Sequence, residues 1–108
     1  MRPRSNLERR RNLRLPTPNG LWVSCKFGDT VWTSRVEDLS ASGAFIATME
    51  NPPVGSRLEL HFSLPEGHIR IQAVVRNVRS GRGVGVEFVS MGGREFEIVL
   101  QVVRRLLG

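Results

Sequence analysis

A two-residue turn between two alternating segments is the feature that most constrains the fold of this chain. In residues 21–27 every second side chain is apolar, which is the period of a strand with one buried face. A glycine and an aspartate then form a short turn signal, and residues 30–38 follow as a second strand. A two-residue hairpin places Cys25 opposite Trp32, both on the apolar face, so the turn and the pattern predict one register.

Further strands follow at short intervals, separated by glycine and proline. We expect them over residues 43–49, 57–64, 68–79 and 82–89. In the third of these strands the apolar side chains change parity near Val74. This change predicts a β-bulge or a bend of the barrel wall.

After two consecutive glycines the pattern changes to that of a helix, over about residues 92–107. Its apolar residues recur three or four positions apart, with charged residues between them; the set is Phe96, Val99, Leu100, Val103, Leu106 and Leu107. The sequence therefore predicts an all-β fold, a small six- to seven-stranded antiparallel β-barrel with a C-terminal α-helix. We expect the helix to close one open end of the barrel.

Positive charge is concentrated at the N-terminus. Residues 1–14 hold six arginines and one glutamate, so this stretch carries +5 of the formal net charge of +6. We therefore expect a flexible basic arm, residues 1–14, followed by the barrel, residues 15–108. Guanidinium clusters suit phosphate, because each planar fork donates two parallel hydrogen bonds to an oxyanion. Such an arm is also typical of unspecific binding to nucleic acid or acidic lipid.

Composition argues against several kinds of site. The single cysteine, Cys25, rules out an internal disulfide and a cysteine-rich zinc site. His61 and His68 have no third ligand near them in the sequence, so we expect no metal site. No nucleophile–base pair can be assembled, and we expect no enzymatic activity and no cofactor. Because there is neither a signal peptide nor an apolar run of about 20 residues, we expect a cytoplasmic protein without a membrane span.

Two motifs stand at the two ends of the first hairpin. The arm contains Arg10 and Arg14 in the pattern RxxxR, and the second strand ends in the pattern DxSxxG, formed by Asp38, Ser40 and Gly43. At this spacing, within alternating strands closed by a helix, the two motifs resemble the PilZ domain family. The resemblance covers nearly the whole chain. It implies a bacterial receptor for the second messenger cyclic di-GMP.

The resemblance implies that the arginines of the arm contact this ligand. Arg10 and Arg14 would hold a phosphate and the Hoogsteen edge of guanine, which presents O6 and N7 as acceptors. Arg11 lies between them and is expected to bind as well. Arg9 is a possible flanking contact.

The second motif would read the opposite edge of the guanine. The carboxylate of Asp38 can accept hydrogen bonds from N1–H and N2–H₂ together, and Ser40 can donate to phosphate or base. Gly43 either leaves room for close backbone approach or permits a positive φ. The same Asp38 and Ser40 could instead only stabilise a turn, through side-chain hydrogen bonds to the backbone.

The family resemblance also implies a mode of action. The arm would wrap across the barrel when ligand binds, and the protein would signal as a monomer or a ligand-dependent dimer. Its unknown protein partner would belong to motility, pilus, polysaccharide or regulatory machinery. Two alternatives stay open, namely a basic barrel that binds RNA or DNA through its arm and a PilZ-like interaction module without ligand.

Overall fold

The chain folds into a β-barrel with a helix across one end. The computed structural model describes residues 15–17 and 21–108. Its elements are β1 (Leu15–Pro16), β2 (Trp22–Phe27), β3 (Thr30–Leu39), β4 (Gly43–Ala47), β5 (Arg57–Leu64), β6 (Gly67–Arg79), β7 (Gly83–Ser90) and α2 (Gly93–Leu107).

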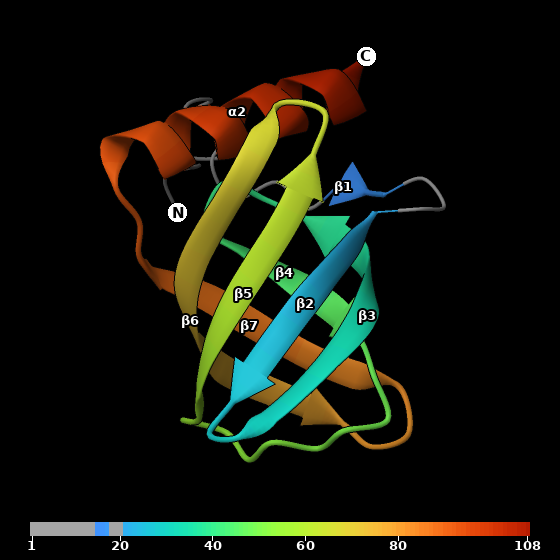
Figure 1. The fold of residues 1–108 in the computed structure, drawn as a ribbon. Coiled ribbons are helices and arrows are strands. Elements are labelled where there is room, and N and C mark those ends of the chain that lie inside the picture. The colour runs from blue at the N-terminus through green and yellow to red at the C-terminus, as the bar shows by residue number, and fades with distance from the viewer. Residues whose placement is uncertain (1–14, 18–20) are drawn as a thin grey trace, which may run out of the picture.

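Six of the strands close the barrel. They pair antiparallel in the order β3-β2-β5-β6-β7-β4, and pairing between β4 and β3 returns the sheet to its start. β1 is a short addition to β3. In Figure 1, β5, β2 and β3 form the wall toward the viewer, β4 and β7 lie behind, and α2 crosses the top. The prediction of an antiparallel barrel of six to seven strands with a C-terminal helix is confirmed.

The first hairpin has the register that its turn and its pattern predict. Cys25 lies opposite Trp32, and Phe27 lies opposite Thr30. Gly28 has a φ of 59°, which a two-residue hairpin turn requires and which glycine adopts without steric cost. The Cys25 side chain is fully buried in the core.

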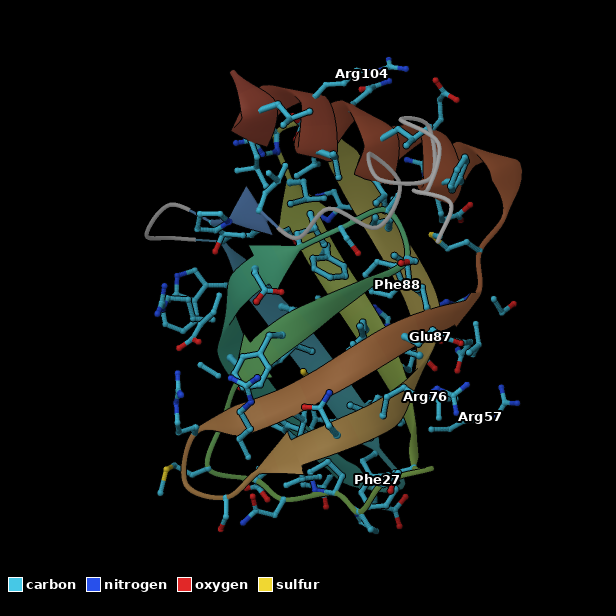
Figure 2. All side chains as sticks on the ribbon, turned by 180° about the vertical axis from the view of Figure 1, so that it is seen from behind. Phe27, Arg57, Arg76, Glu87, Phe88 and Arg104 are labelled. Atoms are coloured by element: carbon cyan, nitrogen blue, oxygen red, sulfur yellow. The ribbon has the colours of Figure 1, made fainter. Side chains whose placement is uncertain are left out.

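The parity change in β6 is a β-bulge. Val75 pairs with Val86 and Asn77 with Gly85, so that Arg76 is an extra residue in this strand. Its guanidinium lies on the outside of the barrel, and its Nη2 is 3.1 Å from a carboxylate oxygen of Glu87 on β7 (Figure 2). A second register shift lies just before Ala73. The bulges bend β6, the longest strand, around the core.

The helix closes the barrel with a face that differs from the predicted one. Its buried residues are Ile98, Val99, Val102 and Val103, and these join the barrel core. The predicted set omitted Ile98 and Val102 and included Leu107, which is 54% exposed. The predicted face is confirmed at Val99 and Val103 and wrong at Leu107. The difference arises because apolar residues cover more than one side of the helix, and packing on the barrel selects the stripe around Val102.

Arginines anchor both ends of α2. At its C-terminal end, Nε and Nη2 of Arg105 donate to the two carboxylate oxygens of Glu66, at 2.6 and 3.2 Å. These bonds lower the pKa of Glu66 below its ordinary value. At the other end, Arg94 donates to the backbone oxygen of His68. In the part of the chain that the structure describes, no helix has the length and apolarity needed to cross a membrane.

Candidate functional site

The DxSxxG motif forms the tight connection between β3 and β4. The backbone N–H of Ser40 donates to the carbonyl of Gly43 at 2.9 Å, which closes a two-residue turn. The Ser40 hydroxyl accepts from the N–H groups of Ser42 and Gly43, at 3.2 and 3.1 Å. Its side chain is 1% exposed. Ser40 therefore stabilises the turn, while direct contact with a ligand stays a prediction.

Gly43 is required by close backbone packing. A Cβ at this position would lie 2.3 Å from the carbonyl oxygen of Val86 on β7. The φ of Gly43 is not positive, so of the two predicted reasons for a glycine here, close approach applies. The backbone of β7 is what lies close to Gly43, so the turn is held against this strand. A second contact reinforces it, because the N–H of Phe88 on β7 donates to the carbonyl of Ser42 at 2.8 Å.

Asp38 is turned to the outside of the barrel by a bulge in β3. Val36 pairs with Ile46 and Asp38 with Phe45, so Glu37 is an extra residue in the strand. Val36 and Leu39, three positions apart, both lie in the core. Strict alternation from Val36 would have turned Asp38 inward, and the bulge reverses the parity. The carboxylate therefore stands half-buried on the outer face, beside Phe45.

The backbone that follows the arm lies next to Asp38. Pro16 of β1 pairs with Asp38, and Leu15 pairs with Leu39. Thr17 reinforces this contact, because its N–H donates to Glu37 O at 3.0 Å and its hydroxyl donates to Val36 O. Arg14 is bonded directly to Leu15, so the arm and the second motif meet through the chain itself.

The predicted contacts of the arm lie outside the described residues. These are Arg9, Arg10, Arg11 and Arg14. The described structure thus brings Asp38, Ser40 and Gly43 together at one turn. The roles of all seven residues toward a ligand remain predictions.

Two residues beside Asp38 were not singled out from the sequence. Phe45 packs on the outer face of β4, opposite Gly85, and its exposed fraction is only 6%. The guanidinium of Arg79 lies over this ring, 5.3 Å from its centroid, in a cation–π contact. Arg79 is distant from the motif in sequence, so that only the pairing of β4, β7 and β6 reveals the neighbourhood.

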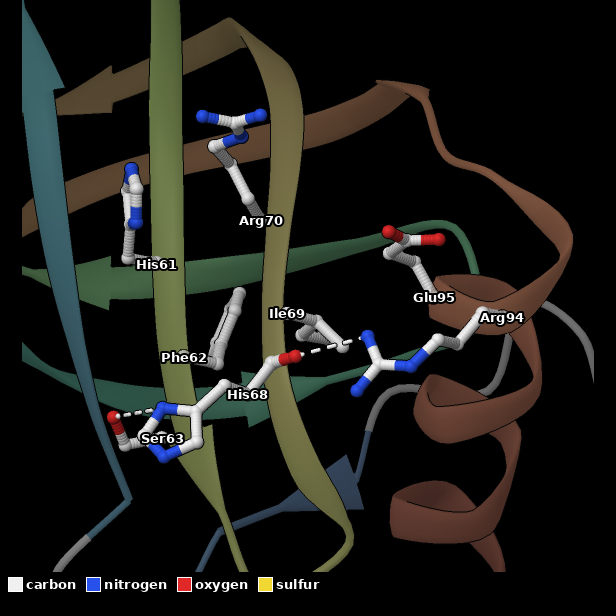
Figure 3. Close-up of a pocket in the computed structure, with 8 residues that line it drawn as sticks. All are labelled: His61, Phe62, Ser63, His68, Ile69, Arg70, Arg94 and Glu95. Carbon is white, nitrogen blue, oxygen red and sulfur yellow. Dashed lines mark hydrogen bonds between the residues drawn. The ribbon is translucent and has the colours of Figure 1, made fainter.

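A pocket of about 430 Å³ lies elsewhere, between the β5–β6 wall and the start of α2 (Figure 3). Its polar groups bind one another: His68 Nδ1 is 3.1 Å from the Ser63 hydroxyl, and Arg94 donates to the His68 carbonyl. His61 Nε2 is 2.6 Å from Glu59, and this hydrogen bond lowers the pKa of the Glu59 carboxyl. Within residues 15–17 and 21–108, no three His, Cys, Asp or Glu side chains gather as metal ligands.

The one cysteine is a core residue. Cys25 is fully buried, and burial raises the pKa of its thiol to about 12. Because the thiolate is the reactive form, this side chain cannot act as a nucleophile near neutral pH. The structure agrees here with the sequence, which indicated a core role.

Known structures share this fold. The PilZ domain of CeSA, from a cellulose-synthesizing bacterium, is 19% identical and has a TM-score of 0.68; the match covers 88% of this chain and 98% of that one. The PilZ domain of YcgR from Escherichia coli, solved with c-di-GMP, is 18% identical with a TM-score of 0.72, and 92% of each chain is covered. PlzA from Borreliella burgdorferi, also in complex with c-di-GMP, is 15% identical with a TM-score of 0.65.

The share of the known chain that the match covers differs between these neighbours. The PlzA match covers 81% of this chain but only 38% of PlzA. No curated protein matches this sequence. At the level of sequence, the family model of the PilZ domain matches residues 8–106. Since that match spans both motifs and nearly the whole chain, the protein belongs to the PilZ domain family.

Proposed function

We propose that this protein is a receptor for cyclic di-GMP. The observation that carries the proposal is the placement of Asp38: a bulge turns its carboxylate outward, beside the backbone that continues from the RxxxR arm. Membership of the PilZ family supports it, as do the c-di-GMP complexes of similar fold. A carboxylate next to guanidinium groups suits a ligand with both guanine and phosphate, and would be repelled by a phosphate backbone alone.

In this proposal each motif meets a different part of the ligand. Arg10 and Arg14, with Arg11 and Arg9 beside them, bind phosphate and the O6/N7 edge of guanine. Asp38 accepts from N1–H and N2–H₂ of a guanine. Ser40 and Gly43 act by holding the turn at the end of β3, so that the Asp38 carboxylate is pre-positioned.

Arg79 adds a cation from the barrel itself. Its guanidinium rests on Phe45, the residue paired with Asp38. A phosphate held by the arm above this surface would come within range of it. An Arg79→Ala variant should therefore bind more weakly than the native protein, although less weakly than Asp38→Ala.

We further propose that the arm becomes ordered on binding. Charge-assisted hydrogen bonds contribute about 1.5–3 kcal/mol each, and part of this offsets the loss of conformational freedom. An affinity near micromolar, about −8 kcal/mol, results. Signalling would then proceed through protein contacts in the cytoplasm, as a monomer or a ligand-dependent dimer.

Titration calorimetry with cyclic di-GMP tests the proposal. We expect saturable heat at tens of micromolar ligand, and a loss of about tenfold or more in affinity for Arg10→Ala and for Asp38→Ala. Asp29→Ala is the matched control, because this exposed carboxylate lies in the β2–β3 turn, and it should bind as the native protein does. Cyclic di-AMP should give no heat, since adenine lacks the donors that Asp38 accepts.

Three results would overturn the proposal. The first is the absence of heat with cyclic di-GMP, and the second is unchanged binding by Asp38→Ala. The third is binding to an oligonucleotide that is steeply dependent on salt and insensitive to Asp38→Ala, which would indicate a nucleic-acid-binding arm.

A further inference from the structure

Thr17 follows β1 directly and bonds to two consecutive carbonyls of β3. Its N–H donates to Glu37 O at 3.0 Å, and its hydroxyl donates to Val36 O. Arg14, the last arginine of the RxxxR motif, precedes it by three positions in the sequence. This half-buried threonine therefore connects the segment that follows the first motif to the strand that carries the second.

The two carbonyls belong to the peptide bonds on either side of the bulge residue. Val36 pairs with Ile46 and Asp38 with Phe45, so Glu37 is the extra residue in β3. In a regular strand consecutive carbonyls point to opposite edges, and a neighbour on one edge bonds to only one of them. Thr17 bonds to both, one through its backbone and one through its side chain. A return to regular alternation would turn one of these carbonyls away, so the pair of bonds favours the bulge.

The direction of Asp38 depends on these same peptide bonds. Regular alternation from the buried Val36 would place Asp38 in the core, and the bulge turns it to the outer face instead. Pro16, the residue before Thr17, pairs with Asp38 itself. A proline has no N–H to donate to β3, so the nearest donors after it along the chain are those of Thr17.

We propose that Thr17 is the positioning residue for Asp38, and that its hydroxyl thereby sets the preference of the site for guanine. This inference rests on the proposed function, in which Asp38 accepts from N1–H and N2–H₂ of a guanine. While both peptide bonds of the bulge are held, the carboxylate keeps the orientation that two parallel hydrogen bonds require. Without the hydroxyl, Thr17 holds one of them, and the double contact is weakened.

Two ligands separate this role from a general effect on binding. Cyclic di-IMP, the inosine analogue, retains the phosphates, O6, N7 and N1–H of cyclic di-GMP but lacks the 2-amino group. In calorimetry the native full chain should bind cyclic di-GMP about tenfold more tightly, because Asp38 makes one hydrogen bond fewer to the analogue. Asp38→Ala should bind the two ligands about equally.

Thr17→Val removes the hydroxyl but keeps the branched side chain and the N–H. It should weaken the binding of cyclic di-GMP about fivefold and that of cyclic di-IMP about twofold, so that the preference for guanine is reduced. In the Asp38→Ala background the same substitution should change neither affinity, because the carboxylate that it positions is gone. Thr17→Ser keeps the donor and should retain the native preference. Thr33→Val, at an exposed threonine of β3, is the matched control and should bind as the native protein does.

The orientation of Asp38 can also be measured without a ligand. Because Asp38 and Phe45 are paired across β3 and β4 and both face outward, NMR of the native chain should show nuclear Overhauser contacts between their side chains. Thr17→Val should weaken these contacts, and Thr17→Ser should preserve them. The remaining amide shifts of both variants should match those of the native barrel, which checks that they are folded.

Three results would overturn the inference. The first is a native preference for cyclic di-GMP in Thr17→Val. The second is an equal loss of affinity for both ligands that persists in the Asp38→Ala background, which would mean that Thr17 only fastens the chain to β3. The third is unchanged contact between Asp38 and Phe45 in Thr17→Val. If the native protein bound neither ligand, the proposed receptor function would fail, and the ligand-free spectra would still decide whether Thr17 orients Asp38.

Discussion

The two halves of β3 differ in how completely other strands enclose them. From Arg35 to Leu39 the strand pairs with β4 on one edge, and Leu15–Thr17 and Leu21 bond to the other. From Thr30 to Ser34, β2 is the one strand among residues 15–17 and 21–108 that pairs with it. The enclosed half holds Asp38 in a defined place, whereas β4 has ended before it reaches Thr33 and Val31 in the open half. One strand therefore combines rigid support with an unpaired edge, two properties that a single uniform ladder cannot provide.

Proline substitutions at adjacent residues would compare the two edges of the open half. Ser34→Pro removes an N–H that bonds to β2 and disturbs a buried position, so it should lower the free energy of unfolding by about 4 kcal/mol. Thr33→Pro removes an N–H on the open edge and should cost about 1 kcal/mol. Urea denaturation of both variants measures the difference. Equal losses would mean that the edge at Thr33 is not open.

Gly43→Ala should destabilise the packing of β4 on β7, next to the enclosed half of β3. The added Cβ would meet the Val86 carbonyl oxygen at 2.3 Å, and the loss of stability should be about 3 kcal/mol. Gly93→Ala is the control, because no atom lies within 4 Å of a Cβ there. This variant should change stability by about 1 kcal/mol at most, in the favourable direction, since Gly93 lies in α2. Similar values in urea denaturation for the two variants would contradict the close approach of β4 and β7.

Ser40→Ala would loosen the turn that ends the enclosed half. The buried N–H of Gly43 and the partly buried N–H of Ser42 would lose their acceptor, at a cost of about 2 kcal/mol. Ser80→Ala, in the exposed β6–β7 turn, should have little effect on the thermal unfolding midpoint. Cyclic di-GMP affinity should fall in Ser40→Ala only through displacement of Asp38. A larger loss of affinity than in Asp38→Ala would instead indicate direct contact with the ligand.

Low pH should loosen the helix α2, which packs against β6 and against β1, the short strand beside the enclosed half. The pKa of Glu66 is lowered by its bonds from Arg105, so the stabilisation is fully present above the ordinary glutamate pKa. It is lost as the pH falls through the lowered folded-state pKa. Glu66→Gln should therefore cost about 1 kcal/mol or less at pH 7, and this cost should vanish once the pH lies below the lowered folded-state pKa of Glu66. A difference that persists at low pH in denaturant titrations would contradict this ionic contribution.

Local patterns predicted the parts of the barrel that depend on local geometry. A two-residue turn permits only one register that buries the apolar side chains of both its strands, so the pairing of Cys25 with Trp32 follows from residues close in sequence. The bulge in β6 leaves a visible change of parity. The DxSxxG pattern indicated a turn, and Ser40 stabilises that turn through its own hydroxyl.

Other features depend on contacts between distant segments. The bulge at Glu37, which turns Asp38 outward, is a shift in the register of β3 against β4. The residues around Glu37 carry no pattern that predicts it. The strand predicted over residues 43–49 is observed as β4, which ends two residues earlier, at Ala47. Because β4 ends at Ala47, which pairs with Arg35, it does not extend to Thr33. The position of Arg79 over Phe45 likewise depends on how β6 and β4 approach across β7.

The burial of Cys25 makes the protein its own reporter of unfolding. The chain has one thiol, it lies in the centre of the barrel wall between β3 and β5, and its pKa of about 12 keeps it protonated. A thiol reagent can therefore modify the chain only in molecules whose β2 has separated from its neighbours. The rate of that modification counts opening events directly, and any ligand or peptide that binds only the closed barrel must slow it.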